Sequence, residues 1–195
     1  MRKVLLLAAF ALFAFTSLHA QEVRLGVKGG LNIASLGGDS YSGLGVGSLS
    51  SRTSFHIGGF AEIPLVGDFA LQPEILYSSE GSDWGGIFTI GGDLKLDYVR
   101  VPVLAKYNMP FVEGLSAELG PVFGVLVNAK SGSLDVKDAY KSFDAQLGIG
   151  ATYRFSFGLS AGLRYNKGLL NINDDSGDDW KNQSNVFQIF AGYSF

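Results

Sequence analysis

Eight times along this chain, apolar and polar side chains alternate residue by residue over nine or more positions. The first run shows the pattern, with Val23, Leu25 and Val27 separated by Arg24 and Gly26. Successive side chains of an extended strand point to opposite faces, so each run gathers its apolar residues on one face. The eight runs are Val23–Ile33, Phe55–Ile63, Phe69–Tyr77, Val99–Tyr107, Leu115–Val127, Phe143–Phe155, Phe157–Tyr165 and Phe187–Phe195. The pattern predicts an all-β protein with eight strands.

Charged residues occupy only one of the two faces of these runs. The apolar face carries none, although Asp, Glu, Lys and Arg make up 17% of the chain. The opposite face is rich in small residues, and its basic residues nearly balance its acidic ones. The charged residues on it are Arg24, Lys28, Glu62, Glu74, Arg100, Lys106, Glu118, Asp144, Arg154 and Arg164.

These two faces can be arranged in two ways. A soluble β-sandwich turns its apolar face inward and leaves its charges in water, whereas a narrow membrane barrel turns its apolar face to lipid. Small residues suit the cramped inside of a barrel, and nearly balanced charges can pair there, as buried charges must. We therefore predict that the charged residues form a structural network in the lumen. The expected partners are Lys28, Arg100 and Arg164 on one side and Glu62, Glu74 and Glu118 on the other.

The connections between the runs alternate in length. The long, polar ones are Leu36–Thr53, Ser79–Lys95, Ala129–Ser142 and Asn171–Ser184, and the others are short. Bacterial outer-membrane barrels have short periplasmic turns, long external loops and strands of about 9–11 residues. Aromatic residues at both ends of the runs match the two interfacial girdles of such barrels. The sequence thus predicts an eight-stranded antiparallel up-and-down transmembrane β-barrel with both chain ends on the periplasmic side.

Three prolines fall inside the predicted strands. Pro73, Pro102 and Pro121 each lack the N–H group that a strand residue donates to its ladder. We expect a β-bulge or a change of register at each of them.

The first twenty residues have the pattern of a secretory signal peptide. Arg2 and Lys3 precede an apolar stretch from Val4 to Phe15, which is too short to span a bilayer as a helix. Small residues then lead to a cleavage site after Ala20. We expect Sec-type export, cleavage near Ala20, a barrel domain over residues 21–195 and location in the cell outer membrane.

Five ordered segments resemble the outer-membrane β-barrel domain of PorT-like proteins, a family typical of Bacteroidetes. The segments are Gly26–Leu36 (GVKGGLNIASL), Gly58–Tyr77 (GGFAEIPLVGDFALQPEILY), Asp97–Tyr107 (DYVRVPVLAKY), Gly158–Asn166 (GLSAGLRYN) and Gly192–Phe195 (GYSF). The resemblance implies a small eight-stranded barrel over essentially all of the exported chain. It implies little about activity, since most such proteins have no assigned biochemical role, and PorT itself is associated with secretion-system assembly.

Few residues suggest chemistry. The chain has no cysteine, and its 15 basic against 18 acidic residues provide no basic surface for nucleic acid. His56, with Ser54 close by near the predicted outer rim, leaves open an alternative as a small lipid A-modifying enzyme. The acidic segment Asn173–Trp180 places four aspartates around a glycine, but the spacing does not fit an EF-hand, so a solvated loop is favoured and cation binding stays open. We assign no catalytic residue, cofactor or metal site.

The inside of an eight-stranded barrel is just wide enough for side chains, so a general porin is not expected. The expected role is structural, interaction-bearing or envelope-assembling, through the external loops. Expected partners are outer-membrane lipid and lipopolysaccharide, the barrel-assembly machinery, which would read a terminal signal formed by Tyr193 and Phe195, and other envelope proteins. A soluble lipocalin-like carrier would need an apolar interior, which the inward charges contradict.

Overall fold

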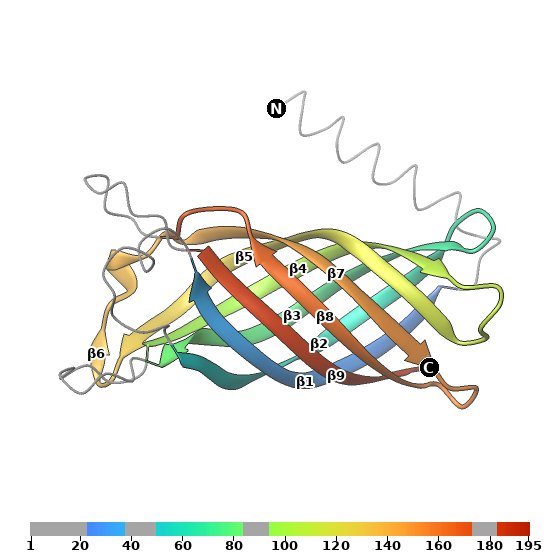
Figure 1. The fold of residues 1–195 in the computed structure, drawn as a ribbon, viewed down its shortest axis with the longest axis horizontal. Helices are drawn as coiled ribbons and strands as arrows, with labels where there is room; N and C mark the ends of the chain where they lie inside the picture. Colours follow the sequence, from blue (N-terminus) through green and yellow to red (C-terminus); the bar gives the residue numbers. More distant parts are fainter. Residues whose placement is uncertain (1–22, 38–49, 84–93, 173–182) are drawn as a thin grey trace, which may run out of the picture.

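The computed structural model describes residues 23–37, 50–83, 94–172 and 183–195, and these form a closed antiparallel β-barrel (Figure 1). The eight long strands are β1 (Arg24–Gly37), β2 (Ser50–Pro64), β3 (Phe69–Asp83), β4 (Leu94–Asn108), β5 (Leu115–Ser131), β7 (Phe143–Arg154), β8 (Leu159–Gly168) and β9 (Gln183–Ser194). Each pairs with the next along the chain, and β1 pairs with β9 to close the barrel. The predicted eight-stranded up-and-down barrel is confirmed.

Two small elements follow β5. The two-residue strand β6 (Leu134–Asp135) pairs with the end of β5, and a 3-10 helix, η2, covers Lys137–Ala139. In the described part of the chain, no helix is long and apolar enough to cross a bilayer.

The two ends of the barrel differ in their connections. At one end, here called the turn end, short turns join β2 to β3, β4 to β5 and β7 to β8, and the chain leaves β9. Positive φ angles at Gly67 (65°) and Gly158 (92°) let two of these turns reverse the chain without steric conflict. The opposite end carries the long connections and is called the loop end.

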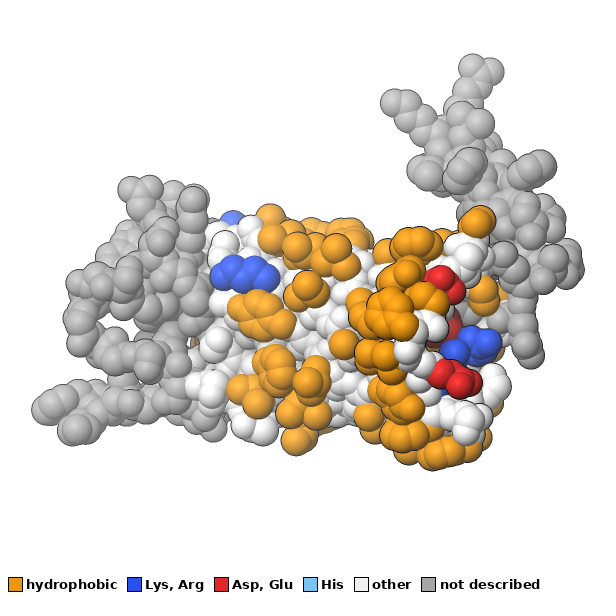
Figure 2. Space-filling view, turned by 45° about the vertical axis from the view of Figure 1, so that its right-hand side comes forward, with side chains coloured by type: hydrophobic (Ala, Val, Ile, Leu, Met, Phe, Trp, Pro, Cys, Tyr) orange, Lys and Arg blue, Asp and Glu red, His pale blue; other side chains and the backbone are white. Residues whose placement is uncertain are grey.

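The apolar face of each strand points outward. Leu25, Val101 and Leu163 are 52%, 41% and 49% exposed, whereas Arg100 and Arg164 are almost completely buried. On the face shown in Figure 2, apolar side chains form patches on the barrel wall, and the charged side chains lie toward its two ends. This distribution suits a wall surrounded by lipid and is the inverse of a soluble β-sandwich.

The expectation of a β-bulge or a change of register at each proline is wrong. The ladder lapses for a few residues near Pro73 and Pro102, but the register is the same on both sides of each gap, and Pro121 stays paired with Leu147. A missing donor removes one hydrogen bond, while the flanking pairs hold the strands in place. The actual register shifts lie nearer the loop end, between Ser51 and His56 and between Asp97 and Tyr98.

The strands also run further toward the loop end than the sequence predicts. Pairing of β3 continues to Asp83 and β4 begins at Leu94, where a connection from Ser79 to Lys95 was expected. Here the barrel encloses a small apolar cluster, the cap core, which consists of Leu94, Leu96, Tyr98, Leu126, Ala129 and Ile172 with Val136 and Tyr140 packed against it. Strand pairing persists because the alternation continues, with the apolar residues now pointing inward.

Candidate functional site

The middle of the lumen holds two carboxylates and two basic groups, here called the central cluster: Lys28, Glu74, Glu118 and Arg164. Arg164 donates through Nη1 and Nη2 to both carboxylate oxygens of Glu74, at 2.9 and 2.8 Å, and through Nε to Glu118 Oε1 at 2.7 Å. Lys28 Nζ donates to the same two Glu74 oxygens at 3.2 and 3.3 Å. All four residues are buried, so this charge pairing is shielded from water.

An aromatic ring completes this layer. Phe190 on β9 points inward, and Lys28 Nζ lies 3.6 Å from the centre of its ring. Gln72 and Thr152 add hydrogen bonds to Glu74 Oε1 (2.7 Å) and Glu118 Oε2 (3.2 Å). Each ion of the central cluster therefore has partners on strands that are distant in sequence.

Toward the turn end, three basic residues share one carboxylate and form the turn-end cluster: Arg24, Glu62, Lys106 and Arg154. Both Arg24 and Arg154 donate through Nη1 to Glu62 Oε1, at 3.0 and 2.9 Å. Lys106 Nζ donates to Glu62 Oε2 at 2.6 Å and to Gln72 Oε1 at 3.1 Å. The side chains of Arg24 and Arg154 remain 39% and 29% exposed, whereas Glu62 is buried. This end of the lumen is open and rich in positive charge.

Toward the loop end, one guanidinium lies between two carboxylates, and this loop-side cluster consists of Glu80, Arg100 and Asp144. Arg100 donates through Nε and Nη2 to the two oxygens of Glu80, at 3.0 and 2.7 Å, and through Nη1 to Asp144 Oδ2 at 2.7 Å. Its guanidinium also lies 4.0 Å from the centre of the Tyr98 ring. The pairing expected for Arg100 is thus wrong, because this residue lies nearer the loop end than Glu62, Glu74 and Glu118.

The structure brings all ten charged residues named from the sequence into these three clusters and adds Glu80 to them. Sequence reasoning missed Glu80 because it falls where a loop was expected. The continued alternation of Ser78, Glu80 and Ser82, all buried, was the signal that could have identified it.

His56 belongs to a group of hydrogen-bonded side chains without Lys, Arg, Asp or Glu, on the loop-end side of the central cluster. Its Nδ1 lies 2.7 Å from Asn32 Oδ1, which also accepts from Gln188 Nε2 at 3.0 Å. Asn32 Nδ2 in turn donates to Ser78 Oγ at 3.0 Å and to the Ser79 carbonyl at 2.8 Å. Ser54, the expected companion of His56, donates to the Ser79 carbonyl at 2.6 Å. His56 is 1% exposed and faces the lumen.

Little space remains between these side chains. A lumenal cavity beside Lys28, Phe60 and Lys106 has a volume of about 20 Å³, which is room for about one water molecule. Within the described residues, no group of three or more His, Cys, Asp or Glu side chains is placed to hold a metal ion. The acidic segment Asn173–Trp180 and the predicted signal peptide lie outside the described residues.

The terminal aromatic residues lie on the outer wall at the turn end. Tyr193 and Phe195 are both exposed, while Phe190 points into the lumen. The terminal aromatics are thus accessible from outside the barrel.

Comparisons with known proteins agree with this architecture. The model of a family described as the outer membrane protein beta-barrel domain matches residues 19–174. No curated protein sequence matches the chain.

Solved barrels resemble the chain in fold. Ail, the attachment invasion locus protein of Yersinia pestis, superposes with a TM-score of 0.53 at 14% identity, over 89% of this chain and 99% of Ail. Neisserial surface protein A gives a TM-score of 0.50 at 16% identity, over 88% of this chain and 97% of that protein. At such identities the likeness shows a shared fold.

Proposed function

The chain belongs to the outer membrane protein beta-barrel domain family, and from that membership we propose that this outer-membrane barrel acts through its loop end, in contacts with other envelope components. In outer-membrane barrels the long loops face the outside of the cell, so the loop end is the exposed end. The resemblance to PorT-like proteins makes envelope assembly the favoured form of contact.

One observation carries this proposal: the barrel wall continues past the lumenal ions to enclose the cap core. On the wall of this extension lies Lys95, whose side chain is 40% exposed and pairs at 3.2 Å with that of Asp97, which is 3% exposed. Outward charges suit water rather than lipid, so this part of the barrel projects beyond the bilayer. The extension gives the loop end a rigid base, and recognition residues commonly lie on loops that a rigid scaffold positions.

The filled lumen supports the same proposal. Among the described residues, the three ionic clusters and the Phe190 ring occupy the interior and leave little room for a solute. We therefore do not propose a general porin.

The position of His56 does not favour the enzymatic alternative. A lipid A-modifying residue must reach lipid at the outer surface, whereas His56 is held inside the lumen by Asn32. Ser54 is engaged with a backbone carbonyl, so the two side chains do not form a nucleophile and base. No enzymatic function is carried forward for this pair.

Site-specific photo-crosslinking in intact outer membranes tests the proposal. A photoreactive residue is placed at Leu134 or Lys137 at the loop end, and matched controls are placed at Leu163 on the lipid-facing wall and Val66 at the turn end. We expect a discrete cross-linked product from the two loop-end positions only. Products of equal yield from all four positions, or porin-like conductance of the purified protein in planar bilayers, would overturn the proposal.

A further inference from the structure

The balance of charge in the lumen changes along the barrel axis. In the central cluster, two basic residues balance two carboxylates. In the loop-side cluster, the single basic residue Arg100 pairs with two carboxylates. In the turn-end cluster, three basic residues share Glu62. Positive charge is therefore in excess within the turn-end cluster, whereas the neighbouring turns carry Asp68 and Glu113.

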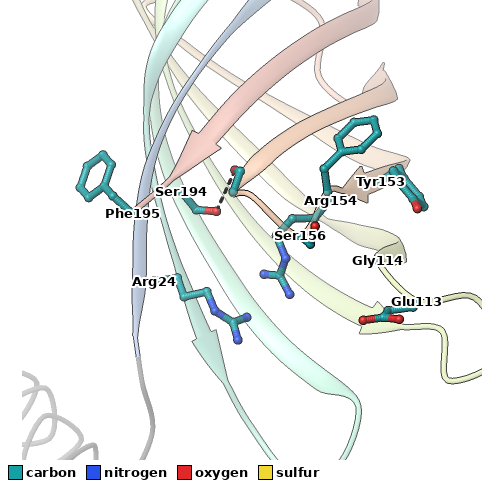
Figure 3. A pocket seen from close by; sticks show the side chains of 10 residues that line it. Arg24, Glu113, Gly114, Tyr153, Arg154, Ser156, Ser194 and Phe195 are labelled. Carbon is teal, nitrogen blue, oxygen red and sulfur yellow. Dashed lines mark hydrogen bonds between the residues drawn. The ribbon is translucent and has the colours of Figure 1, made fainter.

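A pocket opens beside this excess charge. It has a volume of about 700 Å³ and is lined by Arg24 and Arg154 together with Tyr153, Phe155, Ser194 and Glu113. Figure 3 shows the side chains of Arg24 and Arg154 directed toward the same space, with Glu113 on its far side. The pocket lies at the end of the barrel that faces the periplasm in this class of protein.

Both guanidinium groups keep donors for a ligand. A guanidinium has five N–H donors in a rigid fork, and Arg24 and Arg154 each direct one Nη to Glu62 Oε1. Glu62 is buried behind them, so its carboxylate fixes the two forks in position without filling the pocket. Their partial exposure leaves the remaining donors accessible from the turn end.

We propose that the turn-end pocket binds an oxyanion, a carboxylate or a phosphate, between Arg24 and Arg154. Arginine forks match the paired oxygens of both groups and bind them by short, charge-assisted hydrogen bonds. Glu113, on the far side of the pocket, disfavours an anion on its own side. The site is independent of the function proposed for the loop end, because it lies at the opposite end of the barrel.

Titration of the purified full-length barrel in detergent micelles tests the proposal. The probes are inorganic phosphate, the peptide acetyl-Ala-Ala-Phe with a free carboxylate, and the same peptide as its amide. The readout is the NMR signal of the Nε–H groups of Arg24 and Arg154 at constant ionic strength. We expect saturable shifts with a probe that carries an oxyanion and none with the amide. Tighter binding of phosphate or of the acid peptide identifies the source of the anion.

Variants separate a specific site from general attraction between charges. Arg24→Gln and Arg154→Gln each remove one charged donor and should weaken binding about tenfold. Arg52→Gln is the matched control, because Arg52 is also a partly buried arginine with a backbone carbonyl partner, at 2.8 Å, but lies toward the loop end. This variant should leave the affinity unchanged.

A second variant distinguishes ligand binding from a purely structural role. Glu62→Gln removes the carboxylate that competes for the two guanidinium groups, so the anion should bind more tightly, provided that heat-modifiable gel migration shows a folded barrel. The proposal is overturned if no probe gives a saturable shift with the wild-type protein. It is equally overturned if Arg52→Gln weakens binding as much as Arg154→Gln does.

Discussion

Strand β4 contains two stretches that reverse their chemistry. From Val99 to Tyr107 the inward residues are Arg100, Pro102, Leu104 and Lys106 and the outward ones carry no charge. From Leu94 to Tyr98 the inward residues are all apolar, and Lys95 and the buried Asp97 alternate with them. The backbone is a paired strand in both stretches. The difference follows the surroundings expected of the wall: a wall in lipid is free of charge and encloses the ion pairs, whereas a wall in water encloses an apolar core, as in a soluble protein.

The two stretches are stabilised by different interactions. In the membrane part, ion pairs fill the interior, and an ion that loses its partner there remains buried without compensation. In the cap core, apolar side chains pack together, and a truncated residue leaves a cavity. Substitutions in the two regions should therefore differ in how much they lower the free energy of unfolding. They should also differ in how far from the substituted residue the structure is disturbed.

The largest effect is expected at Arg164. Replacing it with Met leaves Glu74 and Glu118 short of their main partner, which should cost about 3–5 kcal/mol of the free energy of unfolding. Urea titration in detergent micelles, followed by gel migration without heating, measures this loss. Arg154→Met is the control, since Arg154 is partly exposed and Glu62 keeps two other basic partners, so its loss should be below about 1 kcal/mol. Equal losses in the two variants would show that burial of the ion pair does not matter.

A charge placed on the outer wall should lower the free energy of unfolding slightly less than the loss of Arg164 does. Leu163→Arg places a cation in the middle of the lipid-facing wall, where about 2–4 kcal/mol is expected. The reverse substitution above the boundary, Lys95→Leu, should change the free energy of unfolding little, because that side chain lies in water. Unfolding in lipid bilayers measures both. A large loss for Lys95→Leu would contradict the boundary inferred from β4.

The cap core should respond locally. Leu96→Ala removes a fully buried side chain and should lower the stability of the cap core by about 2–3 kcal/mol. We expect the loop end to open locally while the ionic part of the barrel stays folded. Limited proteolysis should then cleave the loop end faster, with unchanged heat-modifiable migration. Leu134→Ala, at an exposed position, serves as the control. Loss of the folded band in Leu96→Ala would show that the two regions unfold as a single unit.

The smallest effect is expected at Phe190. Its ring contacts the ammonium group of Lys28, and such a contact contributes about 1–2 kcal/mol when it is desolvated. Phe190→Leu keeps an apolar side chain but removes the ring, so a loss of about this size is expected in urea titrations. Phe187→Leu, on the lipid-facing side of the same strand, tests the loss of a ring without a cation. Equal losses of stability in Phe190→Leu and Phe187→Leu would show that the contact with the Lys28 ammonium group contributes nothing.

The fold was accessible from sequence because alternation is a local signal. Each run assigns its own faces, and the small residues and nearly balanced charges on the face opposite Leu25 and Val101 were what favoured lipid outside. The reversal in β4 was missed because the expected strand began at Val99. Glu80 was missed because the expected strand on β3 ended at Tyr77.

The partners inside the lumen were harder to predict. Arg100 contacts Asp144 from a strand that is not its neighbour, and Arg164 reaches Glu74 across the lumen. Side chains can meet across the lumen only if they lie at the same level along the barrel axis. That level depends on the tilt and stagger of all the strands together. No local pattern contains that information, so membership of the network could be predicted better than its pairings.

The contacts of Arg164 also have a consequence for the order of events when the protein folds. Glu74 lies on β3, Glu118 on β5, Lys28 on β1 and Arg164 on β8, so a sheet that has not yet received β8 holds both carboxylates without their guanidinium. Such an open sheet would keep Lys28 beside Glu74 but would present Glu118 without its basic partner, which is costly in hydrocarbon. Entry of the last strands and neutralisation of the interior therefore have to occur together, and a half-inserted sheet is not a resting state of this chain.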